Sequence, residues 1–278
     1  MLVVKRREHT LKKISFLAHS LGGLIARYAL ALLYSDDLVA ASATTNIKQK
    51  GLIAGLEPIN FITLATPHLG VRGKKQLPFL FGVPILEKLA APIASFVVGQ
   101  TGRQLFLTDG KPNKPPLLLR MASDSDDGNF ISALSAFKCR VLYANVSYDH
   151  MVGWRTSSIR RETELCKPPR RSLDGYKHVV DMEYCPAVPS QNAPSMQNTL
   201  EYHEIMEEEM IRGLQQVSWK KVDVSFHSAF WPFLAHNNIH VKNEWFHNAG
   251  AGVITHVADH IKQQEKQQER PLFITASL

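Results

Sequence analysis

Apolar positions along the chain fall into short continuous runs that alternate with stretches of helical spacing. The first run covers residues 14–18, is rich in strand-forming residues, and ends close to a serine, Ser20. Two glycines follow, and apolar residues then recur at helical spacing. This order predicts a strand, a tight turn with Ser20 at its apex, and a helix over residues 21–34. Arg27 is the single charge of that helix, which we therefore expect to be buried on nearly all sides.

The same alternation continues to the end of the chain. Strands are predicted over Pro58–Thr66, Lys138–Val146 and Lys220–Phe226, and long helices over Thr199–Gln216 and Asn248–Gln268. Because each strand is a short continuous apolar run, the pattern favours an α/β fold, with a mostly parallel sheet and helices on both faces. We expect residues 1–278 to form a single domain.

Two segments depart from this pattern. Residues 77–107 are apolar but interrupted by prolines, and two interpretations stay open: a lid or cap over an acyl-binding pocket, or helices packed beside the sheet. Residues 167–198 are rich in proline, serine and charge, which predicts an irregular exposed insertion. Within it, Lys177–Tyr184 is predicted to pair as an edge strand.

The composition is that of an ordinary globular protein with a mild basic excess. The chain has 278 residues, 45% of them hydrophobic and 21% charged, and a formal net charge of +7. Basic residues gather near residues 5–13 and 160–171, where they are either solvated or make transient contact with a membrane surface. We expect no nucleic-acid partner, because no recognition motif accompanies these basic residues. No obligate protein partner is indicated.

Three scattered cysteines are too few for a disulfide framework or a zinc site, which fits a reducing compartment. The first residues lack the pattern of a secretory signal, and prolines and charges break the most apolar stretch before it could span a membrane. These features predict a cytoplasmic location.

The predicted turn at Ser20 is the strongest chemical signal. A sharp bend between strand and helix exposes a serine hydroxyl beside a helix N-terminus, which is where hydrolases of the G-x-S-x-G pattern place their nucleophile. Here Ala18 replaces the first glycine. The alternative is that the Ser-Leu-Gly-Gly turn only caps a buried helix.

A serine nucleophile needs a base, and the base needs a group that orients it. In this fold type the chain order is serine, acid, histidine. Asp149, just after a predicted strand, is our candidate acid, and Asp126 is the second choice. His236 is the candidate base.

Other histidines compete for the role of base. His240 and His247 are alternative bases, and His227 lies nearer the strand end. We expect His19 to hydrogen-bond within the turn rather than to act as the base. The N–H of Leu21 is the expected oxyanion donor, and a second donor usually comes from a loop after an earlier strand. This chemistry requires no cofactor and no metal.

Three sequence blocks resemble the serine esterases of the DUF676 lipase-like family. They are A-H-S-L-G-G-L-I-A-R-Y-A, F-I-T-L-A-T-P-H-L-G and Y-A-N-V-S-Y-D-H-M-V-G-W-R-T-S-S-I-R. The later block K-K-V-D-V-S-F-H-S-A-F-W-P-F-L-A-H-N-N-I-H-V is similar to its plant members in particular.

This resemblance implies an α/β-hydrolase fold that acts on lipid or other carboxylic esters, with Ser20 as nucleophile and Asp149 as acid. It gives His68 no fixed catalytic role. Family members begin upstream with further strands and a glycine-containing oxyanion loop, so the chain is expected to be N-terminally shortened and to lack the first strands. Two functions follow: a serine esterase or lipase, or a catalytically inactive remnant or binding protein without a complete oxyanion hole.

Overall fold

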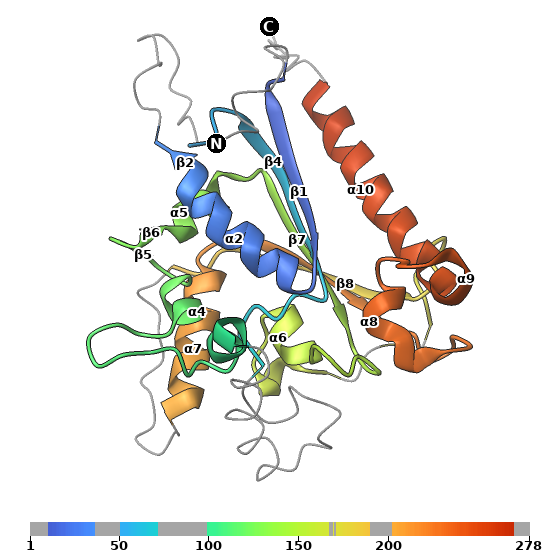
Figure 1. Ribbon diagram of the computed structural model, residues 1–278. Coiled ribbons are helices and arrows are strands. Elements are labelled where there is room, and N and C mark those ends of the chain that lie inside the picture. Colours follow the sequence, from blue (N-terminus) through green and yellow to red (C-terminus); the bar gives the residue numbers. More distant parts are fainter. Residues whose placement is uncertain are drawn as a thin grey trace, which may run out of the picture.

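A five-stranded sheet forms the centre of the computed structural model, which describes residues 11–36, 51–71, 99–166, 169, 171–189 and 202–269 (Figure 1). Its strands, in spatial order, are β1 (Lys13–His19), β4 (Glu57–Leu64), β7 (Cys139–Asn145), β9 (Trp219–Val224) and β8 (Val179–Cys185). The first four are parallel, and β8 is antiparallel to β9. The predicted α/β fold with a mostly parallel sheet is confirmed.

Because β1, β4, β7 and β9 run in one direction, their carboxyl ends lie at one edge of the sheet, at the lower end in Figure 1. The segments that follow these strands therefore meet there, as is usual for functional loops of such sheets. Ser20 follows β1, Asp149 follows β7, and His236 follows β9.

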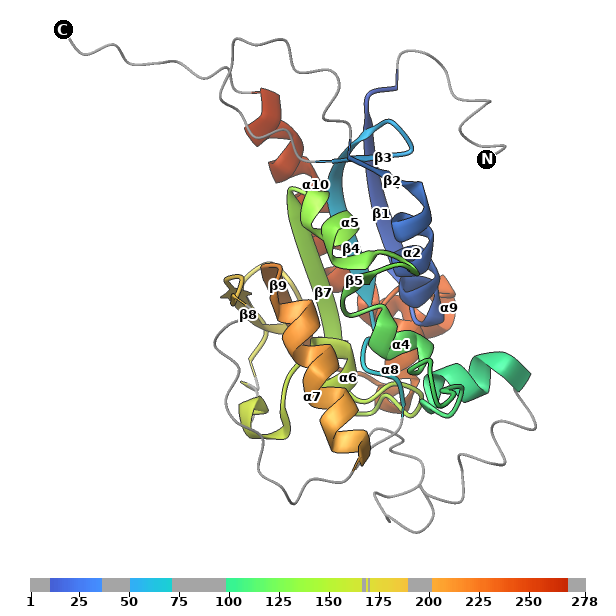
Figure 2. The same ribbon diagram turned by 90° about the vertical axis from the view of Figure 1, so that its left-hand side faces the viewer.

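Helices cover both faces of the sheet (Figure 2). One face carries α2 (Leu21–Leu33), α4 (Leu117–Arg120), α5 (Phe130–Ala136), α6 (Trp154–Ser158) and α7 (Tyr202–Gln215). The other face carries α8 (Ala235–Asn238), α9 (Glu244–His247) and α10 (Ala251–Glu269). Neighbouring residues of the central strands serve the two faces in turn. Phe61 packs in the hydrophobic core on the α2 side of the sheet, and Ile62 packs in the core on the α10 side. Because both faces of β4 are buried, its sequence is a continuous apolar run.

The expectation that α2 is buried on nearly all sides is wrong. Ile25, Tyr28 and Leu32 are 61%, 41% and 65% exposed, at a spacing that places them on one face of the helix. The helix packs on β1 and α5, and β1 is the edge strand of the sheet, so one side of α2 stays uncovered by the described elements. Arg27, its single charged residue, is nevertheless buried.

Shorter elements complete the described fold. They are β2 (Tyr34–Ser35) with β3 (Leu52–Ile53), β5 (Asp124–Ser125) with β6 (Gly128–Asn129), and the 3-10 turns η3 (Glu162–Glu164), η5 (Pro232–Leu234) and η6 (Asn248–Gly250). Of the segment 77–107, residues 77–98 lie outside the described residues, and 99–105 are helical.

In the stretch 167–198, the predicted edge strand is confirmed as β8, whose Val179 and Val180 are buried. Its remaining residues are mostly exposed. None of the described helices combines the length and the apolar character needed to cross a bilayer.

Candidate active site

Ser20 occupies a strained turn between β1 and α2. Its backbone has φ 55° and ψ −132°, a region that L-residues rarely adopt. Two hydrogen bonds tie the turn to the end of β4 and the residues after it: the Ser20 N–H donates to the Leu64 carbonyl at 2.9 Å, and the Thr66 hydroxyl donates to the Ser20 carbonyl at 2.9 Å. The end of the neighbouring strand β4 therefore fixes the conformation that presents the Ser20 side chain.

Only one of the two glycines after Ser20 is needed for close packing. A Cβ at Gly23 would lie 2.2 Å from the Thr66 hydroxyl oxygen, whereas a Cβ at Gly22 would lie 4.0 Å from that of Ala18. The glycine at position 23 thus lets α2 approach the turn after β4, and Thr66 can reach the Ser20 carbonyl.

Ser20, His236 and Asp149 come together at the carboxyl edge of the sheet. The Ser20 Oγ lies 3.0 Å from Nε2 of His236, and Nδ1 of the same ring lies 3.0 Å from Oδ2 of Asp149. His236 is 7% exposed and Asp149 is 3% exposed. The three residues predicted from the order along the sequence are thus joined by two hydrogen bonds, although 216 positions separate the serine from the histidine.

The surroundings of Asp149 favour its ionised form. Its Oδ1 accepts hydrogen bonds from the N–H groups of Met151 and Val152 at 3.0 and 2.8 Å, and its Oδ2 accepts one from the Asn145 amide at 2.8 Å. Burial alone would raise the pKa of Asp149, but the contacts with His236, Asn145 and Val152 outweigh it and lower that pKa. The carboxylate is therefore charged at neutral pH.

This charge determines the state of the histidine ring. A carboxylate can only accept hydrogen bonds, so Nδ1 of His236 carries the proton that it donates to Asp149. In the neutral ring, Nε2 is then an acceptor, and the Ser20 hydroxyl donates to it. The arrangement can remove a proton from Ser20 and stabilise the resulting imidazolium.

The other candidate bases lie elsewhere. His240 stacks on His19, with ring centroids 3.8 Å apart, and its Nδ1 has no hydrogen-bond partner among the described residues. His247 is buried, and within the described part of the chain its Nδ1 also lacks a partner, while Nδ1 of His227 lies 2.9 Å from the Tyr148 hydroxyl. Among the described residues, His236 alone hydrogen-bonds with both Ser20 and Asp149.

His19 does not hydrogen-bond within the turn, contrary to expectation. Its Nε2 lies 2.9 Å from the backbone carbonyl of His236, and the two rings are 4.6 Å apart. Burial, reinforced by His240 and His236, lowers the pKa of His19 to about 4. The ring is therefore neutral at neutral pH and donates its Nε2 proton to the carbonyl. It links the serine turn directly to the segment that carries the base.

Leu21 is the first residue of α2, so its N–H has no acceptor within the helix. The N-terminus of α2 also carries partial positive charge, which favours an anion beside Ser20. These properties suit the oxyanion donor predicted at this position.

A mostly apolar cavity of about 430 Å³ includes the first turn of α2 in its wall. Its walls come from α2, the helical residues 99–105 and α4, and include Leu21, Leu24, Ile25, Leu105, Leu118 and Met121. Leu21, the residue after Ser20, lines this cavity, and Gln100, Gln104 and Arg120 add polar groups to its wall. Its volume falls within the range of sites for small ligands.

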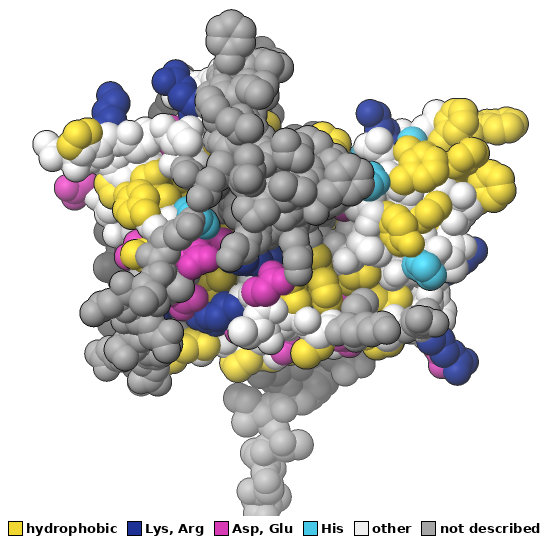
Figure 3. Space-filling model, turned by 90° about the horizontal axis from the view of Figure 1, so that it is seen from below, with side chains coloured by type: hydrophobic (Ala, Val, Ile, Leu, Met, Phe, Trp, Pro, Cys, Tyr) yellow, Lys and Arg dark blue, Asp and Glu magenta, His cyan; other side chains and the backbone are white. Residues whose placement is uncertain are grey.

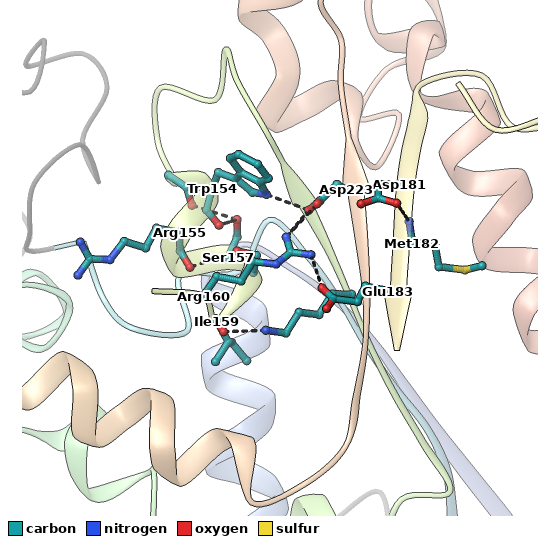
Figure 4. Close-up of polar contacts among 12 residues, drawn as sticks. Trp154, Arg155, Ser157, Ile159, Arg160, Asp181, Met182, Glu183 and Asp223 are labelled. Carbon is teal, nitrogen blue, oxygen red and sulfur yellow. Dashed lines mark hydrogen bonds and ion pairs between the residues drawn. The ribbon is translucent and has the colours of Figure 1, made fainter. Parts of the chain in front are cut away.

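A buried ion pair anchors the chain just beyond Asp149 (Figure 4). The Arg160 guanidinium lies 2.8 and 2.9 Å from the two carboxylate oxygens of Asp223 on β9, and Trp154 of α6 donates to the same carboxylate at 2.8 Å. Arg160 also contacts Glu183 of β8 at 3.2 Å. Burial opposes the charge of Arg160, but these two carboxylates outweigh it and raise the pKa of Arg160. The loop from β7 to α6, which holds Asp149, is thereby fixed to the sheet.

Two arginines of the basic run at residues 160–171 are paired with carboxylates. Arg160 is buried in the ion pair with Asp223, and Arg161 pairs with Glu208 at 2.8 Å and Glu164 at 2.9 Å. These two arginines therefore stabilise the fold rather than provide free positive charge. No group of three or more metal-binding side chains occurs in the part of the chain that the structure describes.

Two supporting residues are not predicted from the sequence: Asn145 hydrogen-bonds to Asp149, and Thr66 hydrogen-bonds to Ser20. For His19 a hydrogen bond is predicted, but not its partner, the His236 carbonyl. Asn145 and Thr66 share a signal, since each is a polar residue at or just after the end of a buried strand, next to the candidate site. The partner of His19 has no such signal.

Known proteins resemble the chain in sequence. Residues 1–164 match a family described as "Putative serine esterase (DUF676)". The "Putative lipase YDL109C" of Saccharomyces cerevisiae is 34% identical over 147 residues, which is 53% of this chain and 19% of that protein. The "Putative lipase C4A8.10" of Schizosaccharomyces pombe is 32% identical over 148 residues, covering 52% of this chain and 16% of that protein.

The "Putative lipase ROG1" of Saccharomyces cerevisiae is 33% identical over 153 residues, or 55% of this chain and 18% of that protein. The chain thus spans less than a fifth of the length of these relatives. No solved structure matches it.

The family match covers more than half of the chain and contains Ser20 and Asp149, while His236 lies beyond it. The hydrogen bonds of His236 are therefore an observation independent of the match. With the parallel sheet, the strained serine turn and this match together, the chain belongs to the DUF676 family, described as "Putative serine esterase".

Proposed function

We propose that this chain is a serine esterase that hydrolyses carboxylic esters, including lipid esters, through an acyl-enzyme. The observation that carries this proposal is the continuous hydrogen-bonded contact from Ser20 to His236 to Asp149, with both distances at 3.0 Å. A nucleophile, a base and a group that orients the base are the three parts that acyl transfer to serine requires.

In the first half of the proposed reaction, Ser20 Oγ attacks the ester carbonyl carbon while Nε2 of His236 accepts the hydroxyl proton. Asp149 stabilises the imidazolium that forms. The Leu21 N–H and the N-terminus of α2 stabilise the negative oxygen of the tetrahedral intermediate. The bond to the alcohol then breaks, and the imidazolium gives its proton to the departing oxygen, which leaves Ser20 acylated.

In the second half, a water molecule attacks the acyl carbon and gives a proton to Nε2 of His236. The second tetrahedral intermediate collapses, the bond to Ser20 breaks, and the serine oxygen recovers the proton. The products are a carboxylic acid and an alcohol, and the site returns to its starting state.

The apolar cavity supports an apolar acyl group in the substrate. Leu21, Leu24 and Met121 line it, and it begins one residue beyond the nucleophile, so an acyl chain on Ser20 could enter it. The names of the relatives, which contain the word lipase, point the same way.

A fluorophosphonate probe tests the proposal, because it forms a covalent bond only with an activated serine. We expect labelling of the wild-type chain at Ser20 and its loss in Ser20→Ala. Ser147→Ala is the matched control, since Ser147 is exposed on the same edge of the sheet and should not affect labelling. Absence of labelling in a folded sample would reject the proposal.

A second candidate is a binding protein without catalysis. It is favoured by the position of β1 at the edge of the sheet among the described strands, because the second oxyanion donor usually follows a strand that precedes the nucleophile strand. One donor stabilises the intermediate less than a pair, and each contributes about 3–4 kcal/mol. If ligand binding were measured without any labelling of Ser20, this candidate would be preferred.

The free thiols of Cys139, Cys166 and Cys185 support a cytoplasmic location, because unpaired cysteines are typical of reducing compartments. Expression of a tagged chain followed by fractionation tests this part of the proposal.

A further inference from the structure

Five large aromatic side chains lie exposed in the segment that carries the candidate base. We call them the aromatic surface: Phe230 is 86% exposed, Trp231 45%, Phe233 49%, Trp245 92% and Phe246 63%. Seen from the edge where the parallel strands end, hydrophobic side chains gather on the side of α8 and α9 (Figure 3). Single exposed apolar residues are common in proteins, but a group of this size marks an interaction site.

Three of the five rings of the aromatic surface pack against one another. Phe230 and Trp231 meet edge to face with centroids 4.9 Å apart, and Trp231 meets Phe233 in the same way at 5.4 Å. Such packing orders the side chains against one another while their outer faces remain exposed.

The backbone beneath these rings is also held. The Asn238 amide donates to the Trp231 carbonyl at 3.2 Å, and the Asn243 side chain accepts from the N–H groups of Trp245 and Phe246 at 2.9 and 3.3 Å. Ile239 anchors the segment in the core. These hydrogen bonds and the burial of Ile239 fix the backbone that carries the rings. The rings are therefore exposed in the folded structure itself.

The formal charges of the segment that carries the aromatic surface indicate which class of partner it binds. In residues 226–247 the formally charged side chains are Lys242 and Glu244, which cancel. Such a surface offers no net attraction to nucleic acid or to an acidic protein. An uncharged interface into which aromatic rings can insert suits it better, and tryptophan is enriched where proteins meet the headgroup region of membranes.

The aromatic surface adjoins the candidate site. His236 lies between its two groups of rings in the sequence, and its ring reaches Ser20. The loop that holds Asp149 meets the same segment where the Tyr148 hydroxyl lies 2.9 Å from His227. That loop adds one more exposed apolar side chain, Met151, at 60%.

We propose that the aromatic surface docks the chain on an electrically neutral or zwitterionic lipid–water interface. The rings insert at headgroup depth, and the docked chain faces the lipid with the edge of the sheet at which Ser20 lies. Docking itself depends only on the exposed rings. Its use, the delivery of lipid esters to Ser20, rests on the proposed function.

The test is co-sedimentation of the chain with phosphatidylcholine vesicles. We expect the wild-type chain to bind, and Trp245→Ala with Phe246→Ala to lower the partition coefficient at least about tenfold, because each ring buries a large apolar area. Tyr184→Ala with Tyr202→Ala is the matched control. These two residues are 69% and 70% exposed on β8 and α7, and their removal should leave binding unchanged. Thermal unfolding of both double variants checks that the fold is intact.

Three results would overturn the proposal. One is no binding of the wild-type chain to the vesicles. Another is binding that needs anionic lipid and disappears at high salt, since that would implicate basic residues instead. The last is self-association that the Trp245→Ala, Phe246→Ala variant abolishes, because the rings would then join two copies of the chain.

The Ser20→Ala variant separates docking from catalysis, and we expect it to bind the vesicles as the wild type does. Vesicle binding without fluorophosphonate labelling would reject the proposed function and keep the docking surface. Labelling without vesicle binding would keep the proposed function and reject the docking surface.

Discussion

The Nε2 of His19 lies 2.9 Å from the backbone carbonyl oxygen of His236, which ties the residue before the nucleophile to the segment that carries the base. This hydrogen bond involves neither the Ser20 hydroxyl nor the His236 ring. It joins two segments 217 positions apart, and the distance from Ser20 to the imidazole depends on how these segments sit. His19 is therefore a positioning residue in the proposed mechanism.

Replacement of His19 should lower the rate of acylation more than substrate binding. His19→Phe keeps a ring that can stack on His240 but removes the donor, and we expect kcat to fall about two- to tenfold with little change in KM, the value of one buried hydrogen bond. His19→Gln supplies an amide donor and should recover part of the loss. If both variants gave the same kcat, the hydrogen bond would have no positioning role.

The contact between α2 and the turn after β4 gives a second prediction. Gly23→Ala places a methyl group 2.2 Å from the Thr66 hydroxyl oxygen, so α2 or the turn must move. We expect a loss of about 1–3 kcal/mol in the free energy of unfolding and slower labelling of Ser20. Chemical denaturation and probe kinetics measure the two effects.

The neighbouring glycine is the control. A Cβ at Gly22 has its nearest neighbour at 4.0 Å, so Gly22→Ala should be neutral or stabilising by up to about 1 kcal/mol, the helix preference of alanine over glycine. Equal losses for the two substitutions would show that the close contact with Thr66 is not what requires a glycine.

The sheet and its long helices could be predicted because the apolar pattern records burial directly. β4 is buried on both faces and reads as an unbroken apolar run, and α7 and α10 are long enough to show helical spacing. Short elements leave no such pattern. The four-residue helices α8 and α9 lie between the strand predicted over 220–226 and the helix predicted over 248–268, where the sequence predicts no element, because a single turn has no periodicity to detect.

Chain order predicts that Ser20, an acid after β7 and a histidine after β9 meet at one edge of the sheet, because parallel strands bring their following loops together, but it does not select His236 among the late histidines. Contacts that depend on side-chain placement across the fold could not be predicted. Nothing near position 19 in the sequence indicates a partner at position 236, and the exposure of Ile25 depends on which elements flank α2.

The choice of Asp149 over Asp126 can be tested directly. Asp149→Asn keeps the shape of the side chain but removes the charge that holds the His236 tautomer, and we expect kcat for a soluble short-chain ester to fall by about 10⁴-fold. Asp126 lies exposed in the turn between β5 and β6, so Asp126→Asn should retain full activity. A large loss in the second variant instead of the first would reassign the acid.

Three histidines, His256 and His260 buried and His19 partly buried, should make the fold sensitive to acid. Burial is the main cause that lowers the pKa of His19, His256 and His260 from 6.5 to about 4. Between these values the unfolded chain binds more protons than the folded one, so the free energy of unfolding decreases as the pH falls from 6.5 toward 4.

Urea unfolding at several pH values measures this slope. His260→Asn removes one of the three groups and should make the slope shallower, whereas Gln263→Asn, an exposed change on the same helix, should keep the wild-type slope. An unchanged slope in His260→Asn would show that this histidine protonates in the folded state as easily as in the unfolded one.

The ion pair of Arg160 and Asp223 should contribute to both stability and the site. Asp223→Ala leaves a buried guanidinium without its main partner, and we expect a loss of about 3–5 kcal/mol in the free energy of unfolding. Because Trp154 loses the same acceptor, the loop that carries Asp149 should also loosen, and labelling of Ser20 should slow. Asp181→Ala, an exposed change on β8, should stay within about 0.5 kcal/mol of the wild type.

The double variant Arg160→Met with Asp223→Leu removes both charges together and should recover most of the lost stability, since buried pairs can be replaced by apolar side chains. Recovery of stability without recovery of the labelling rate would show that the polar contact with Trp154, rather than the packing at this position, holds the loop in place.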